Sequence, residues 1–104
     1  MKIATTPQPP YYAVIFTSVK SSKTEGYNDM AIYLDKLLTK QPGFLGYESA
    51  REEIGITVSY WASLEDIKAW KGNDIHSKAQ EVGKRLWYDN YSVRIAKVEK
   101  EYSL

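Results

Sequence analysis

Hydrophobic and polar positions along this chain repeat with two different periods, which predict an ordered series of strands and helices. Residues 11–18 are rich in aromatic and β-branched side chains on both faces, as is typical of a buried strand. The polar residues 19–26 predict a loop. Apolar residues then recur at helical spacing and predict a helix, its apolar face formed by Tyr27, Met30, Leu34, Leu37 and Leu38.

Two further strand patterns follow this helix, which Pro42 and Gly43 end. Residues 44–53 and 55–62 are separated by a short turn near Gly55, so they predict an antiparallel hairpin. In the second strand aliphatic residues alternate with polar ones and with Trp61. One face is therefore expected to be aliphatic and the other polar with one large indole.

Ser63 and Asp66 form the start signal of a second helix, which is expected to end near residues 72–73. Asp74 is placed to begin a further helix. Its apolar stripe is Ile75, Ala79, Val82 and Leu86, and the neighbouring stripe is His76, Gln80, Gly83 and Trp87.

The last strand pattern covers residues 91–98. Its alternation slips by one position at Ile95, which predicts a bulge or a strand covered on both faces. The order β-α-β-β-α-β is typical of an α+β, ferredoxin-like sandwich, with a four-stranded antiparallel sheet and helices on one face. Because Pro7, Pro9 and Pro10 fix their own backbone and disfavour helix in the residue before each, we expect residues 1–10 to be an extended lead-in followed by one domain, 11–104.

The uncovered face of such a sheet would carry aromatic and apolar residues. Water would then contact a larger apolar patch than monomers normally expose. We therefore expect a homodimer through the open sheet face, with a ligand cavity in the closed space between the sheets. A chain of 104 residues has little spare interior, so a pocket is expected to require the second subunit.

Composition narrows the function classes. Fourteen basic against thirteen acidic residues give a net charge of +1, so we expect no nucleic-acid partner. The chain has no Cys, which excludes disulfides and thiolate sites and makes the cytoplasm the simplest location. The longest apolar run, residues 11–16, is far short of the ~20 residues of a membrane helix, so no membrane partner is expected.

Standard catalytic motifs are missing. With one His, no Cys and no Gly-rich loop, the sequence offers no nucleophilic triad, phosphate loop or metal site. Its unusual feature is the aromatic content of nine Tyr and three Trp against two Phe. Trp61, Trp70 and Trp87 would suit the wall of a cavity for a flat, partly polar ligand, and they would equally suit a dimer core.

Two polar residues have the same ambiguity. His76 is either a functional group, as a proton shuttle or iron ligand, or a plain imidazole on the helix surface. It lies beside the apolar stripe, four residues before Gln80, so it is expected to point toward a groove. Arg94 on the last strand either enters the cavity to hold an anionic ligand or pairs with a carboxylate.

Several runs of residues resemble the antibiotic biosynthesis monooxygenase family of small dimeric α/β barrel proteins, over nearly the whole of residues 11–102. They are the runs 41–51, 55–63 and 75–80, the last lying ahead of Trp87-Tyr88. The most specific are Trp61 at the end of the third strand and the Trp-x5-His segment from Trp70 to His76.

The resemblance implies cofactor-free oxidation of an aromatic substrate such as an anthrone, phenol or quinol by dioxygen. For this chemistry the lone histidine and the aromatic residues suggest the hypothesis that His76 is the base. The substrate-binding residues expected around the cavity are Trp61, Trp70, Gln80, Trp87 and Arg94. A noncatalytic dimer that binds a small aromatic molecule, or a stress-related one, is the alternative.

The family's other chemistry is oxidative cleavage of haem, which is implied to use an Asn on the first strand, the Trp that ends the third, and a His as iron ligand. Trp61 matches that Trp. However, residues 11–18 contain no Asn, and the iron-ligand position falls on Gln80, with His76 one turn earlier. A neutral amide is a poor iron ligand, so haem is disfavoured and no cofactor is expected.

Overall fold

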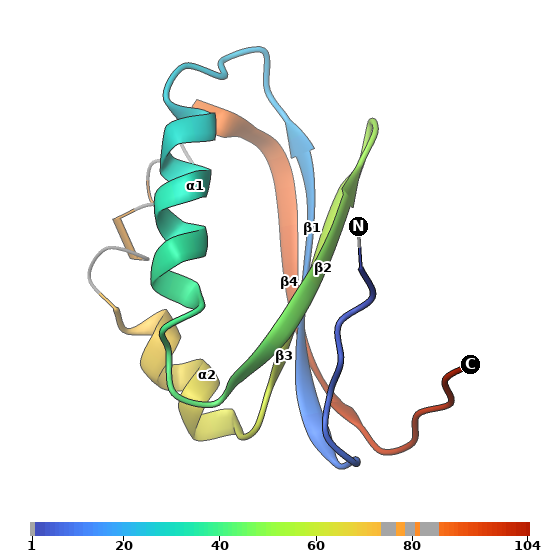
Figure 1. The fold of residues 1–104 in the computed structure, drawn as a ribbon. Coiled ribbons are helices and arrows are strands. Elements are labelled where there is room, and N and C mark those ends of the chain that lie inside the picture. The colour runs from blue at the N-terminus through green and yellow to red at the C-terminus, as the bar shows by residue number, and fades with distance from the viewer. Residues whose placement is uncertain (1, 74–76, 79–80, 82–85) are drawn as a thin grey trace.

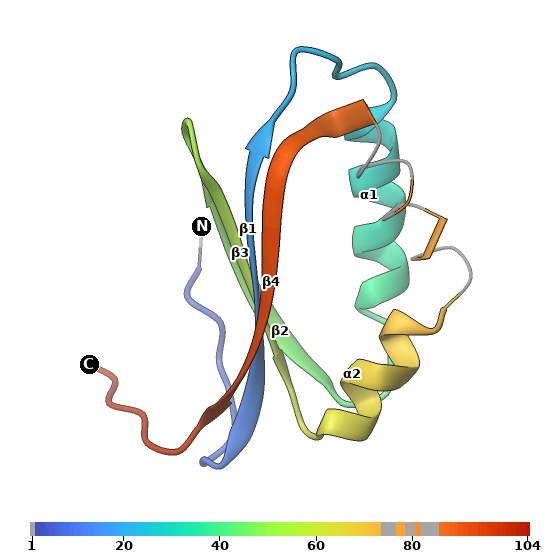
Figure 2. The ribbon, with the colours of Figure 1, turned by 180° about the vertical axis from the view of Figure 1, so that it is seen from behind.

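The computed structural model describes residues 2–73, 77–78, 81 and 86–104, and in them two helices cover one face of a four-stranded sheet (Figures 1 and 2). The elements are β1 (Tyr11–Lys20), α1 (Tyr27–Leu38), β2 (Phe44–Arg51), β3 (Gly55–Trp61), α2 (Leu64–Lys71) and β4 (Tyr88–Val98). The strand order is β2-β3-β1-β4 and all neighbours are antiparallel. The predicted α+β, ferredoxin-like arrangement is confirmed.

The helix expected from Asp74 to Leu86 falls mostly outside the described residues. In the described part of the chain, no helix has the length and apolar character that would let it cross a membrane.

The last strand differs from its prediction. β4 begins at Tyr88 rather than at residue 91, and β1 continues to Lys20. Asp and Asn have low strand propensity, but Asn90 pairs with Val19 and Tyr88 with Lys20, which holds this segment in the sheet with Asp89 at a register shift. The bulge expected at Ile95 is wrong, because the register runs without a break from Tyr11 opposite Val98 to Val19 opposite Asn90.

The second helix begins as its sequence signal predicts. The Ser63 hydroxyl accepts a hydrogen bond from the backbone N–H of Asp66 at 3.1 Å and lies 2.8 Å from the Asp66 carboxylate. This cap satisfies one of the free N–H groups at the helix start. Behind it, Ile67 is buried against the sheet side of the molecule. α2 is thereby fixed at the end of β3.

Gly43, in the turn before β2, cannot carry a side chain without strain. Its φ is +79°, and a Cβ would overlap the Asp66 carboxylate. We therefore expect Gly43→Ala to lower the free energy of unfolding by about 1–2 kcal/mol, measured by urea denaturation. Gly72 has a φ of −82° and ordinary contacts around its position, so Gly72→Ala is the matched control. The control should leave stability equal or slightly higher, and equal effects in both variants would contradict this explanation.

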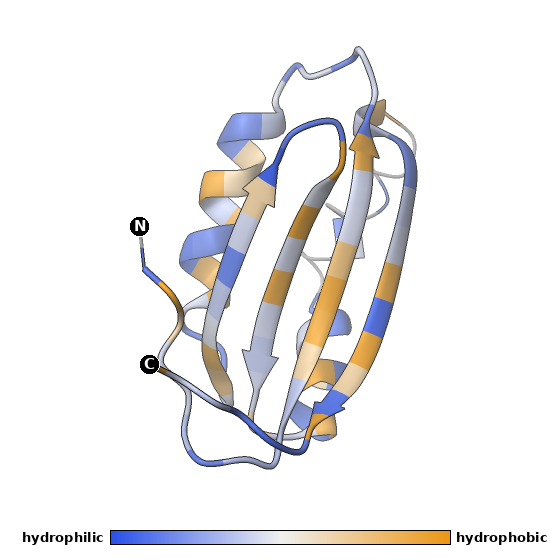
Figure 3. Ribbon diagram, turned by 90° about the vertical axis from the view of Figure 1, so that its right-hand side faces the viewer, coloured by the Kyte–Doolittle hydropathy of each residue, from blue (hydrophilic) through white to orange (hydrophobic). Residues whose placement is uncertain are grey.

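The sheet presents its other face uncovered by helices, as Figure 3 shows from that side. Alternation along the paired strands places Ile15, Val58 and Arg94 in one row across this open face. Ile56 and Val19 lie on the same face and are exposed apolar side chains. We call this surface the open face.

The N-terminal segment and the C-terminal tail cross one end of the open face. The Ala4 N–H donates to the Glu48 carboxylate at 2.9 Å, and the Tyr60 hydroxyl donates to the same carboxylate at 2.6 Å. Burial and this acceptor raise the pKa of Tyr60 to about 12. The Tyr11 hydroxyl donates to Glu101 at 2.7 Å. Glu48 is in register with Val58, whereas Ile56 lies further along β3, beside the hairpin turn, and outside this set of contacts.

Candidate functional site

A cavity of about 620 Å³ lies between the helix layer and the sheet, within one chain. Its volume is in the range of small-molecule sites. A ligand space between two sheets, expected from the sequence, stays a prediction, because the structure holds a single chain. The cavity in this chain follows from the placement of α1, which covers the sheet although none of its side chains is buried. The helix therefore roofs the space without filling it.

The roof of the cavity is largely apolar. α1 contributes most of it, α2 adds Ile67 and Trp70, and charged groups occur along the same walls. The lining residues of α1 are Tyr27, Ala31, Ile32, Leu34, Asp35, Lys36 and Leu38. Such a roof provides contact area for a flat hydrophobic ring system.

The floor of the cavity has two unlike halves. The part formed by β1 and β4 is apolar along Val14, Phe16, Val93 and Ile95, and Tyr88 adds a hydroxyl at its end. Under β2 and β3 the floor carries hydroxyl groups. The hydroxyls of Ser49 and Thr57 are hydrogen-bonded at 2.8 Å, and the Ser59 hydroxyl accepts from the Trp61 Nε1–H at 2.9 Å. A ligand with an apolar side and a polar edge matches this floor.

Arg51 occupies one end of the floor through an arrangement that spans three strands. Arg51 on β2 is paired with Gly55 on β3, and Gly55 is paired with Ser18 on β1. The Arg51 side chain crosses Gly55, and its Nη2 donates to the hydroxyl of Ser18, which is 1% exposed. A Cβ at position 55 would overlap the guanidinium, so this crossing requires glycine.

Tyrosine hydroxyls lie at the same end as Arg51. The Tyr88 hydroxyl donates to Tyr27 at 3.4 Å, and both residues line the cavity. Burial is the main cause that raises the pKa of Tyr88, and the Tyr27 hydrogen bond adds to it, whereas Arg51 acts in the opposite direction. The Lys20 ammonium lies 3.8 Å from the Tyr27 ring centroid. Tyr88 therefore remains a protonated donor at neutral pH.

Two tryptophans form the opposite end. Trp70 on α2 lines the cavity and stacks on Trp61, with the ring centroids 6.4 Å apart and an interplanar angle of 29°. Trp61 itself is fully buried and also contacts Phe44 edge to face at 5.5 Å. The cavity wall at this end is therefore an indole supported from behind by a second indole.

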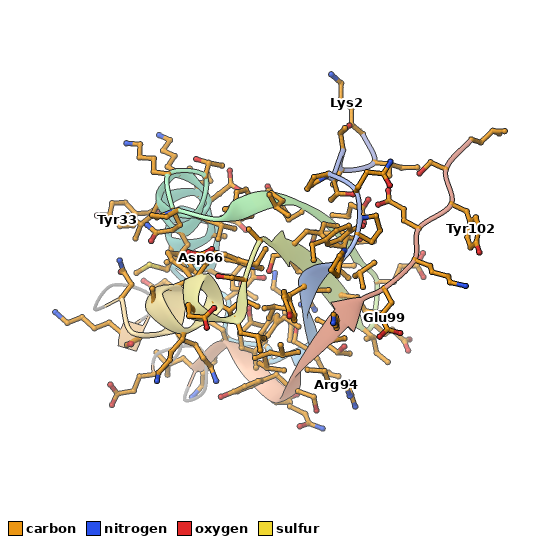
Figure 4. The ribbon with its side chains drawn as sticks, turned by 90° about the horizontal axis from the view of Figure 1, so that it is seen from below. Lys2, Tyr33, Asp66, Arg94, Glu99 and Tyr102 are labelled. Atoms are coloured by element: carbon orange, nitrogen blue, oxygen red, sulfur yellow. The ribbon has the colours of Figure 1, made fainter. Side chains whose placement is uncertain are left out.

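The structure brings together only some of the residues that the sequence predicts for the site. Trp70 lines the cavity, and Trp61 lies behind it. Trp87 is buried outside the lining, against Tyr27, and its Nε1–H donates to a backbone carbonyl at 3.0 Å. Arg94 lies on the open face, away from both helices, as Figure 4 shows. The remaining two predicted residues, His76 and Gln80, lie outside the described residues.

Sequence reasoning missed the polar end of the cavity. Alternation along residues 44–53 places Tyr47, Ser49 and Arg51 on one face of the strand. The turn between the two strands then pairs Arg51 with Gly55. This combination of an arginine at a strand end with a glycine across the hairpin was the signal that could have located the site. Tyr47 is bound in turn by Asp35, and this hydrogen bond is the main cause that raises its pKa.

No group of three or more metal-ligating side chains occurs among the residues that the structure describes. The described lining residues offer contact area for a ring system, hydrogen bonds to its oxygen atoms and a positive charge on Arg51.

Comparisons with known proteins agree with this architecture. The model of the antibiotic biosynthesis monooxygenase family matches residues 10–82. YqjZ, an uncharacterized protein of Bacillus subtilis strain 168, is 50% identical over 101 residues, which are 95% of this chain and 89% of that protein.

Two solved structures share the fold at low sequence identity. Protein SO0527 from Shewanella oneidensis has a TM-score of 0.74 at 11% identity, over 92% of this chain and 97% of its own. SnoaB, a cofactor-independent oxygenase from Streptomyces nogalater, has a TM-score of 0.70 at 9% identity, over 92% and 98% respectively. From the family match and the YqjZ relationship, the chain belongs to the antibiotic biosynthesis monooxygenase family.

Proposed function

We propose that this protein is a cofactor-independent monooxygenase that acts on a small aromatic substrate, such as a phenol, quinol or anthrone, in the cavity between the helices and the sheet. The observation that carries the proposal is the cavity itself, whose roof and floor combine aromatic and apolar walls with hydroxyl groups along one side. The family of the chain and the oxygenase activity of SnoaB, which shares the fold, support it.

The reaction needs no external reductant. When an anthrone CH₂ group becomes a carbonyl, one oxygen atom of O₂ enters the product and the other leaves as water with the two substrate hydrogens. The substrate becomes reactive toward O₂ once it is deprotonated, so the protein must remove a proton and stabilise the resulting anion. Bound in the cavity, that anion would accept hydrogen bonds from groups such as the Tyr27 hydroxyl.

We assign the proton-abstracting role to His76, the one histidine of the chain. Imidazole is the side chain best suited to take up and release a proton near neutral pH. Trp70 is assigned to the wall against which the substrate rings pack, and Trp61 holds Trp70 in place.

We further propose that the protein is a homodimer and that the open face is its interface. Isolated antiparallel sheets leave one face in water only when that face is polar. The open face instead carries the apolar side chains Ile15 and Val58 in its middle row, between Arg94 and Glu48, and the exposed Ile56 beside the hairpin turn. A second copy would bury these side chains while the cavity on the other side of the sheet stays accessible.

The test is dioxygen uptake by purified, metal-stripped protein with a panel of anthrones and hydroquinones. Uptake should exceed the spontaneous rate, and His76→Ala should reduce turnover by about 10²-fold or more. Added imidazole should restore part of the lost turnover, which a merely structural role of His76 would not allow.

Full turnover in His76→Ala would remove His76 as the base. If no substrate of the panel is oxidised although the cavity binds aromatic probes, the protein is a noncatalytic binding dimer and the proposed function is wrong. A haem titration that gives a tight, stoichiometric complex would favour the haem chemistry of the family instead.

A further inference from the structure

We infer that the cavity selects aromatic molecules that carry a carboxylate, and that Arg51 binds this group at the end of the cavity remote from Trp70. The inference deepens the proposed function, because it rests on the same cavity and names the class of substrate. It follows from three observations: how Arg51 is held, which charges line the cavity, and how far apart its two ends lie.

The Arg51 residue is exposed, and its guanidinium is held on the sheet side by one hydrogen bond. Its side chain lies over Gly55 and its Nη2 donates to the buried Ser18 hydroxyl. A guanidinium has five N–H donors, so one hydrogen bond to Ser18 leaves others for a ligand. Because a planar guanidinium matches the two oxygens of a carboxylate, a held arginine of this kind favours that group over a neutral one.

The charges of the described lining residues also favour an anion. The cationic ones are Lys36, Arg51 and Lys71, and the carboxylate among them is Asp35. The hydrogen bond from Tyr47 occupies Asp35. A cleft with an excess of positive charge and low-dielectric walls attracts anionic ligands.

The distance between the two ends sets the size of the ligand. Along β3, Gly55 beneath Arg51 and Ser59 near the tryptophan pair are four residues apart, which is about 13 Å in an extended strand. Two or three fused rings with a carboxylate at one end span this length. The rings would then pack against Trp70 while the carboxylate meets Arg51.

The experiment compares two fluorescent probes that differ in charge, anthracene-2-carboxylate and 2-(hydroxymethyl)anthracene. Their dissociation constants are measured by fluorescence anisotropy at pH 7. We expect the native protein to bind the carboxylate at least about tenfold more tightly than the alcohol. Arg51→Ala should remove this preference and leave the affinity for the alcohol unchanged. Arg94→Ala, which removes an arginine from the opposite face, should retain the preference.

A second variant moves the charge without deleting it. In Gly55→Ala the added methyl group takes the space that the guanidinium crosses, so Arg51 must leave Ser18. Its flexible end can swing away, and the protein should stay folded with unchanged far-ultraviolet circular dichroism. We expect Gly55→Ala to lose most of the carboxylate preference, as Arg51→Ala does.

The inference is overturned if the native protein binds both probes equally, if it binds neither, or if Arg51→Ala weakens both probes to the same extent. The two anthracene probes test binding only, because neither carries the acidic proton that oxygenation requires. Dioxygen uptake is measured separately with the anthrones and hydroquinones. A carboxylate preference without any uptake would contradict only the proposed reaction, and uptake without the preference would contradict only the role of Arg51.

Discussion

Replacing Trp61 with alanine should lower the free energy of unfolding by about 3–5 kcal/mol, the largest stability loss that we expect from a single substitution in this chain. Trp61 is 0% exposed, contacts Phe44 edge to face and stacks on Trp70. Its removal would leave a cavity at the junction of β3 and α2 and would free the Ser59 hydroxyl from its donor. Urea denaturation at one fixed protein concentration is the measurement.

Two control variants separate structural support from ligand contact. Trp61→Phe keeps a ring in the space and should lose much less stability. Trp70→Ala removes a less buried indole that lines the cavity, so it should weaken aromatic-probe binding more than it weakens folding. A Trp61→Ala protein with native stability but no ligand binding would contradict this assignment and would make Trp61 a direct ligand contact.

Replacing Ile56 with lysine should dissociate the proposed dimer and leave the fold intact. Ile56 is 45% exposed in the single chain, so a lysine there can reach water in the monomer. In a dimer through the open face the ammonium group would be buried without a partner, which costs several kcal/mol. Light scattering after size-exclusion chromatography should give the mass of one chain for the variant and of two for the native protein.

Leu64→Lys is the matched control for this experiment. Leu64 is similarly exposed, at 49%, but it begins α2 in the helix layer. The control should therefore remain dimeric. A native protein that is monomeric at micromolar concentration would overturn the interface, and so would a variant with Ile56→Lys that keeps the dimeric mass.

The sequence predicts the order of the described elements because periodicity and capping are local signals. The Ser63 cap and the apolar spacing of α1 each depend on a few neighbouring residues, and both are confirmed. The start of β4 depends instead on a long-range partner. Residues 89–90 are poor strand formers, and the pairing of Tyr88 and Asn90 with the end of β1 keeps this segment in the sheet.

The site was harder to predict because it depends on which face of a strand each residue occupies. Arg94 and Arg51 both lie on strands, and register decides between them. Ile95 faces the cavity and Arg94 faces the open face. The sequence alone does not reveal this, because Ile95 and Ala96 are both apolar and interrupt the alternation of apolar and polar residues. The position of Arg51 becomes evident only once the hairpin turn is known to pair it with Gly55.

The tryptophans illustrate a second limit. Composition predicts that large aromatic side chains are important, but it does not separate a wall from its support. Trp70 lines the cavity, whereas Trp61 and Trp87 are buried and contact other rings. This difference follows from the packing of α2 and α1 on the sheet, which involves residues far apart in the chain.

The two unlike halves of the cavity floor also come from different parts of the gene. The apolar half is built by β1 and β4, which lie near opposite ends of the chain, whereas the hydroxyl-bearing half and Arg51 belong to one continuous hairpin, Phe44 to Trp61. Replacement of one short coding segment, that of residues 44–61, would thus exchange the polar half of the floor in a single step. Relatives with the same scaffold could acquire new ligand preferences in this way without rebuilding the strands that join the two termini.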